Sequence, residues 1–187
     1  LALGDDPDRA RLEAAAVARF VRQVQPPGGV VVEGAKADKL DRLLTACGRM
    51  PLVVALPAVF FEDELPALRE LVRACAAARL PVEANSWGGW RLARDAGVQI
   101  EAGPGLAVLN SLAARALGEA GVSCATLSIE ADRRQLEDVA AHCPIPCSLV
   151  VYGRPALMTS RVKLSEDHLG QVFADRRDVQ MVPRRER

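Results

Sequence analysis

Aromatic residues are scarce in this chain and make up only 4% of its 187 residues. Half of the residues are nonetheless hydrophobic, so the core must be built mainly from alanine, leucine and valine. That composition is typical of helices packed on a parallel β-sheet. A chain of this length is sufficient for one domain with a substantial core.

The chain also lacks an excess of either charge, since 24 lysines and arginines balance 24 aspartates and glutamates. No bulk charge therefore draws it to nucleic acid or to a membrane surface. No apolar run is long enough to span a bilayer, and no basic-then-apolar segment typical of a secretory signal opens the sequence. The five cysteines are odd in number and irregularly spaced, which favours reduced thiols and a cytoplasmic protein.

Standard signatures of hydrolases and of metal sites are missing as well. There is no G-x-S-x-G and no H-E-x-x-H, and the only histidines are His142 and His168. Cys143 and Cys147 lie close to His142, but their spacing is not C-x-x-C and no second pair exists, so we predict no metal site. The glycines of residues 103–105 fail the dinucleotide pattern, and we predict a plain tight turn there and no cofactor.

Short apolar segments alternate with helical patterns along most of the chain. A first helix is predicted over residues 5–24, because apolar residues recur there at helical spacing. Alternation of this kind favours right-handed βαβ units and a parallel sheet. The predicted strands cover residues 29–33, 51–57, 81–85, 99–102, 123–129 and 148–152, and the intervening helices cover residues 37–47, 60–78, 89–96, 106–120 and 132–142.

Two α/β architectures fit this pattern. One is an incomplete TIM-like (β/α) barrel with about six parallel strands, and the other is an open, doubly wound parallel sheet. We expect the incomplete barrel over residues 1–162 and a polar C-terminal tail over residues 163–187. The sequence opens at Leu1 rather than at a methionine, so we expect the missing strands to come from earlier residues, from a second polypeptide or from a second copy.

Polar side chains follow the predicted strands, at the carboxyl-end rim where parallel α/β folds place their functional residues. Glu130 and Arg154 end adjacent strands, and such a pair can bind a carboxylate or hold a water. We predict them as catalytic residues, although a structural ion pair is the alternative. The predicted substrate-binding residues are Asn85, Asn110, Ser128, Tyr152 and Arg161.

Two of these predictions have simpler alternatives. Asn110 is also placed to satisfy backbone groups in the first turn of its helix. The alternative for Arg161 is a solvated arginine at the protein surface.

The motifs LNS, LSIE and YGRPALMTSR follow one another between residues 98 and 161. In order and spacing they resemble peptidase U family 32, the collagenase-like peptidases, over about the last half of the chain. The resemblance implies a barrel-like fold and a hydrolase that acts at the carboxyl-end rim. The matching residues are Asn110, Ser111, Ser128, Glu130, Gly153, Arg154, Leu157, Met158, Ser160 and Arg161.

Other members of that family resemble oxygen-independent hydroxylases, which use prephenate and an iron–sulfur cluster held by four cysteines. In those proteins the GR-x-x-LM segment leads into the first cluster cysteine, whereas this chain has Lys163 at or near that place and no cysteine after Cys147. The resemblance therefore implies no cluster here. The alternative to a hydrolase is a non-catalytic or partner subunit of such a hydroxylase system, which modifies RNA or a quinone. RNA binding by the chain itself is disfavoured by its neutral charge.

Overall fold

A computed structural model of the chain describes residues 9–14, 28–151 and 165–183. The chain divides into two compact units, Leu1–Gly153 and Arg154–Arg187, and each unit is described by itself. Every helix in these described ranges is too short or too polar to cross a membrane.

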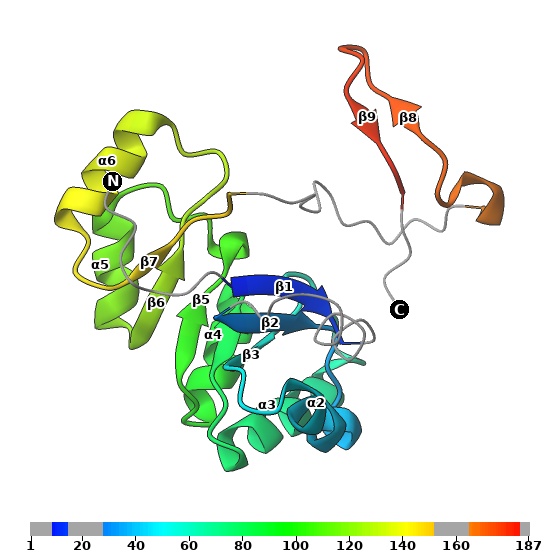
Figure 1. Cartoon of the computed structure of the whole chain (residues 1–187), viewed down its shortest axis with the longest axis vertical. Coiled ribbons are helices and arrows are strands. Elements are labelled where there is room, and N and C mark those ends of the chain that lie inside the picture. Colours follow the sequence, from blue (N-terminus) through cyan, green and yellow to red (C-terminus); the bar gives the residue numbers. More distant parts are fainter. Residues whose placement is uncertain (1–8, 15–27, 152–164, 184–187) are drawn as a thin grey trace. The chain divides into compact units, whose positions relative to one another are not determined.

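The first unit is built on a seven-stranded sheet whose strands follow one another in chain order. Each strand pairs in parallel with the next, and the sheet curves into a half-barrel (Figure 1). This confirms an α/β fold with an incomplete, open parallel barrel. The strands are β1 (Arg9–Glu13), β2 (Gly29–Glu33), β3 (Leu52–Ala55), β4 (Val82–Ala84), β5 (Ile100–Ala102), β6 (Val122–Thr126) and β7 (Cys147–Ser148).

Helices connect the strands from β2 onward and cover the outer face of the sheet (Figure 1). Three of them begin with a side chain that accepts a hydrogen bond from the backbone N–H three residues later: Ser86, Asn110 and Asp132. Such caps satisfy N–H groups that have no partner within the helix. The helical elements are η1 (Ala37–Lys39), α2 (Leu40–Cys47), α3 (Leu65–Ala77), α4 (Trp87–Asp95), η2 (Pro104–Leu106), α5 (Ser111–Glu119) and α6 (Arg133–His142).

The main core lies between the sheet and these helices. Alternate strand residues such as Val54, Val82 and Ile100 pack with Leu71 and Val72 of α3 in one buried cluster. The intervening residues point to the opposite, concave face, because successive side chains of a strand alternate between faces. Three of those residues form a small separate apolar cluster: Val31, Val53 and Ala55.

The helix predicted over residues 5–24 is wrong for its described part, because Arg9–Glu13 is strand β1. It pairs with β2 in register from Arg9↔Gly29 to Glu13↔Glu33. Leu12 packs against the buried cluster of Val30 and Val32, whereas Arg11 faces the other side of the sheet. Pairing with β2 has thus overridden the helical spacing of the apolar residues, and residues 15–27 lie outside the described part.

The second unit holds a short antiparallel hairpin of β8 (Phe173–Ala174) and β9 (Gln180–Met181), preceded by the 3-10 helix η3 (Glu166–His168). Asp175 closes the hairpin turn, since its Oδ1 accepts hydrogen bonds from the N–H groups of Arg177 (2.7 Å) and Val179 (3.0 Å). The hairpin falls within the polar tail predicted over residues 163–187.

Replacing Leu56 by alanine should lower the free energy of unfolding by about 2–5 kcal/mol, the usual cost of emptying a packed leucine site. Leu56 is only 1% exposed and belongs to the main core. Urea denaturation measures the change, with Leu112→Ala as the control, because Leu112 is 72% exposed on α5. Equal losses in the two variants would contradict this assignment of the core.

Candidate functional site

Four polar residues are buried among the residues that the structure describes: Glu83, Asn85, Glu101 and Ser128. Glu83 and Asn85 flank Ala84, which packs on the outer face, so both point to the concave face. Glu101 lies between the outward-facing Ile100 and Ala102 and is in register with Glu83. The concave face of β4 and β5 is therefore polar where the outer face is apolar.

An arginine from the first strand reaches Glu83 across the concave face. Arg11 Nη2 donates to both carboxylate oxygens of Glu83, at 2.6 and 2.5 Å, and Arg11 Nη1 lies 2.7 Å from Glu33 Oε1. The side chain of Glu83 is only 3% exposed, and a charge buried to this extent needs a partner. Two strands separate β1 from β4, so the curvature of the sheet brings the partners together.

Asn85 extends this ion pair into a hydrogen-bond network. Its Nδ2 donates to Glu83 Oε1 (2.8 Å) and to the carbonyl oxygen of Leu56 (3.0 Å), and its Oδ1 accepts from the N–H of Gly105 (3.2 Å). The amide thus joins the end of β3, β4 and the turn that follows β5. Asn85, predicted as a substrate-binding residue, is held in this network and orients the carboxylate beside it.

The glycines of residues 103–105 allow this close packing. A Cβ on Gly103 would come within 2.5 Å of Glu83 Oε1 and closer still to Asn85 Oδ1. A Cβ on Gly105 would collide with the backbone carbonyl oxygen of Asn85. The turn after β5 is therefore glycine-rich because it packs directly against the polar network.

The concave face carries a charged group formed by Arg11 and the glutamates that it contacts. Burial lowers the pKa of Arg11, but its hydrogen bonds to Glu83 and Glu33 and their charges outweigh burial and raise this pKa above its usual value. Arg11 is consequently a permanent cation. Within the described residues Arg11 pairs with two glutamates, Glu33 and Glu83, so the formal charge of these three side chains together is negative.

The predicted rim residues of β6 lie together in one turn. Ser128 is buried, and its Oγ accepts a hydrogen bond from the N–H of Glu130 (3.2 Å). Its own N–H donates to the carbonyl oxygen of Val108 (2.9 Å), which fixes the turn to the segment before α5. Glu130 is exposed on this turn.

The remaining predicted residues are placed differently. Asn110 is exposed and caps α5, because its Oδ1 accepts from the N–H of Ala113 (2.8 Å), in line with the simpler alternative. Tyr152, Arg154 and Arg161 lie outside the described residues. The predicted pair of Glu130 and Arg154 therefore stays a prediction.

The sequence patterns did not predict Arg11 and Glu83, the two residues at the centre of the network, as site residues. Arg11 fell within the predicted helix, and Glu83 fell within a strand that was predicted as apolar. The available signal was the single charge inside the short apolar segment PVEAN, since a charge in the middle of a buried strand requires a partner. The identity of that partner, 72 residues away in the sequence, could not be read from the pattern.

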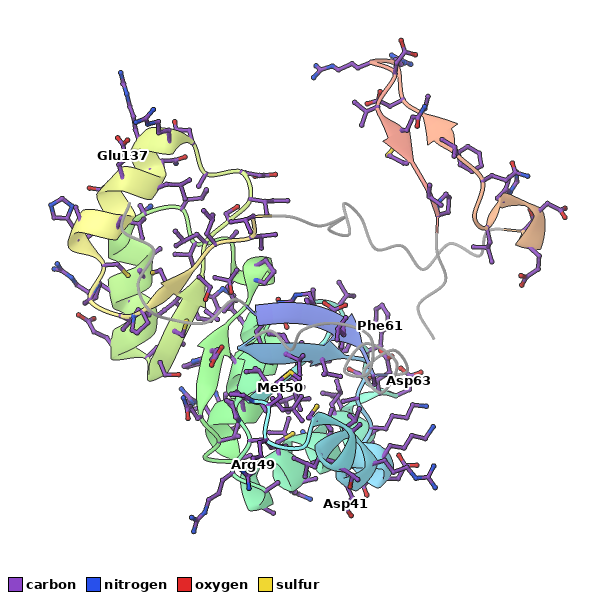
Figure 2. All side chains as sticks on the ribbon, in the orientation of Figure 1. Asp41, Arg49, Met50, Phe61, Asp63 and Glu137 are labelled. Atoms are coloured by element: carbon purple, nitrogen blue, oxygen red, sulfur yellow. The ribbon has the colours of Figure 1, made fainter. Side chains whose placement is uncertain are left out.

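A cavity of about 430 Å³ lies at the amino-terminal ends of β3 to β5. Its lining includes Cys47, Met50, Pro51, Pro81 and Gln99, and Met50 is labelled in Figure 2. In parallel barrels this edge contributes to stability and the opposite edge carries chemistry. We therefore place the candidate site at the polar network and the carboxyl-end rim. Within the described ranges, no group of three or more metal-ligating side chains is arranged to hold a metal ion.

Neither a protein-family model, nor a curated protein, nor a solved structure matches the chain. The resemblance to the collagenase-like peptidases remains a prediction from the sequence motifs of residues 98–161.

Replacing Glu83 by alanine should lower the free energy of unfolding by about 3 kcal/mol, the low end for a broken buried pair. The low end applies because Arg11 is 32% exposed and keeps its contact with Glu33. Glu137→Ala is the matched control, since Glu137 pairs at 2.8 Å with Arg133 on the exposed face of α6 (Figure 2).

The control should lose less than about 1 kcal/mol, as exposed ion pairs do. Chemical denaturation of both variants measures the difference. A loss for Glu83→Ala no larger than that of the control would show that the buried pair does not hold β1 to β4.

Proposed function

We propose that the chain is a hydrolase of the collagenase-like peptidase type that cleaves amide bonds at the carboxyl-end rim of its half-barrel. The observation that carries the proposal is the buried network of Arg11, Glu83 and Asn85 on the concave face. The motif resemblance supports amide hydrolysis as the reaction, and the network supports the concave face and its rim as the location of the site.

A buried ion pair is a costly way to stabilise a sheet. Well-packed apolar residues of similar volume are often as stabilising or more so, and the concave face already holds the apolar cluster of Val31, Val53 and Ala55. A network kept beside such a cluster is better explained by a role in binding or catalysis. Its position just below the strand ends agrees with the usual location of active sites in parallel barrels.

Within this proposal, Glu83 has a positioning role. A carboxylate that accepts two hydrogen bonds from Arg11 and one from Asn85 has its oxygens occupied by protein donors and is not free to bind a water. Glu130 is exposed on the turn after β6, and Ser128 holds its backbone. An exposed carboxylate at the rim is the better group to activate water.

The proposed reaction uses two side chains, Glu130 to transfer a proton and Arg154 to stabilise negative charge. The oxygen of a water molecule attacks the amide carbonyl carbon while its proton passes to Glu130. Arg154 stabilises the negative charge that develops on the carbonyl oxygen. Glu130 then returns the proton to the leaving nitrogen as the carbon–nitrogen bond breaks.

Substrate contacts fall to the other predicted residues. Asn85, Asn110 and Ser128 already accept backbone hydrogen bonds, so they shape the site and hold its turns. We propose that Tyr152 and Arg161 contact the substrate directly. All five cysteines are free thiols, which supports a protein of the reducing cytoplasm.

A second candidate function follows from the edges of the sheet. Among the described strands, β1 and β7 each pair with one neighbour, whereas a closed barrel pairs its first strand with its last. We propose, as the alternative, that another polypeptide or a second copy completes the barrel. The chain would then be a non-catalytic or partner subunit of a prephenate-dependent hydroxylase system.

The hydrolase proposal predicts that the purified chain degrades fluorescein-labelled gelatin, with initial rates that saturate as gelatin is increased. Glu130→Gln should lower the rate by about 10²–10⁴-fold, the usual contribution of a general base. Arg154→Ala should lower it by about 10²–10³-fold, the loss expected for one group that stabilises the oxyanion. Glu137→Gln is the control, because Glu137 is an exposed glutamate on α6.

Circular dichroism shows whether each variant keeps its fold. Unchanged turnover in folded Glu130→Gln would reject Glu130 as the base. A wild-type chain without turnover would reject the hydrolase proposal for the chain alone.

Native mass spectrometry of the protein purified from its own source tests the second candidate. If the barrel is completed by a partner, the observed mass should exceed that of one chain by a second polypeptide or a second copy. A single chain of about the sequence mass would contradict the partner proposal, and the gelatin assay is independent of this result.

A further inference from the structure

Two cysteines lie next to each other where α6 leads into β7. Cys143 follows the last residue of α6, Cys147 is the first residue of β7, and the linking sequence is Pro-Ile-Pro. Their Sγ atoms are 3.0 Å apart, which is only about 1 Å longer than a disulfide bond. Both are free thiols.

The backbone around the pair holds the two sulfurs in place. The N–H of Cys143 donates to the carbonyl oxygen of Val139 at 2.8 Å and ends the helix. Cys147 is in register with Ala125 of β6. Both thiols lie near the carbonyl oxygen of Ile145, at 3.1 Å from Cys143 Sγ and 3.6 Å from Cys147 Sγ. The prolines restrict the backbone between them, so bond formation needs little rearrangement.

Accessibility separates this pair from the cysteines of the core. Cys147 is exposed and Cys143 is half-buried, whereas Cys47 and Cys75 are buried. Burial raises the pKa of Cys75 to about 11, and an inaccessible protonated thiol is unreactive. The remaining cysteine, Cys124 on β6, is half-buried.

We propose that Cys143 and Cys147 are a redox-active dithiol that reacts with small disulfides and closes into an intramolecular bond. In the first step the sulfur of one of the two cysteines attacks one sulfur of the small disulfide, which forms a mixed disulfide and releases one thiol. In the second step the other cysteine attacks the protein sulfur of that mixed disulfide and releases the other thiol. Two protein thiols are oxidised, one small disulfide is reduced, and the two protons leave on the released thiols.

The two thiols of the pair affect each other's chemistry. Burial, the hydrogen bond to Cys143 and the charges of Cys143 and Cys124 raise the pKa of Cys147 to about 12. A mixed disulfide on Cys143 removes the contributions of that residue, and Cys147 then ionises more readily.

The disulfide would tie the end of α6 to the beginning of β7. This strand is at the edge of the described sheet, and the chain runs from it directly into residues 149–154. Oxidation would thus restrain the connection between α6 and β7. The dithiol does not depend on the proposed hydrolase activity.

Oxidised glutathione tests the proposal on the full chain. The reduced protein is incubated with it under anaerobic conditions, unfolded in guanidinium chloride so that the buried thiols also react, alkylated with iodoacetamide, and analysed by intact and peptide mass spectrometry. Of the five cysteines, two should be protected from alkylation, no glutathione should remain attached, and a peptide pair joined through Cys143 and Cys147 should be found. Dithiothreitol should restore all five thiols.

Variants identify the two thiols of the pair. Cys147→Ser should accumulate a stable glutathione adduct on Cys143, and Cys143→Ser should accumulate one on Cys147, because the second thiol is missing in each. Neither variant should form the internal disulfide. Cys124→Ser is the matched control, since Cys124 is half-buried on the neighbouring strand, and it should form the disulfide as the wild type does.

A second measurement reports the proximity of the thiols without an oxidant. Phenylarsine oxide condenses with two neighbouring thiols and releases water, so the wild type and Cys124→Ser should be retained on a phenylarsine oxide resin. Cys143→Ser and Cys147→Ser should not be retained. Persistent glutathione on both cysteines of the wild type, or a bond between Cys124 and Cys147, would overturn the proposal, as would equal retention of all variants.

Discussion

The ion pair between Arg11 and Glu83 joins strands that are three places apart in the sheet. A carboxylate that is almost completely buried is stable only with a charged partner and further hydrogen bonds. Arg11 supplies the charge, and Asn85 supplies one of the hydrogen bonds. The pair can form only if the sheet curves, so the charge requirement of Glu83 and the half-barrel shape depend on each other.

The two faces of the sheet follow from this constraint. The outer face packs valines and leucines against helices, and this apolar contact supplies most of the stability. The concave face combines the polar network with the small cluster of Val31, Val53 and Ala55. The turn after β5 has to approach the network closely, which explains why Gly103 and Gly105 carry no side chain.

Two separate features of the sheet indicate function. Ser128 and Glu130 share one turn after β6, and the dithiol of Cys143 and Cys147 begins the neighbouring strand. The thiol pair lies at the amino-terminal end of β7, where α6 leads into the strand, and is therefore separate from the carboxyl-end rim. Amide hydrolysis and thiol chemistry use different residues here, so each can be present without the other.

The sequence by itself determined the alternation of strands and helices from β2 to β7. Local signals are sufficient for this, because apolar runs, glycine and proline turns and capping residues such as Asn110 and Asp132 act on neighbouring residues. It also predicted the turn at Gly103, and it placed Ser128 and Glu130 at a strand end.

Only the tertiary structure decided the role of β1. Its short segment has helical spacing, and pairing with β2 outweighs that preference. The same pairing places Arg11 where it reaches Glu83, which Asn85 also contacts. Contacts between residues far apart in the sequence depend on the curvature of the sheet, and no local pattern encodes that curvature.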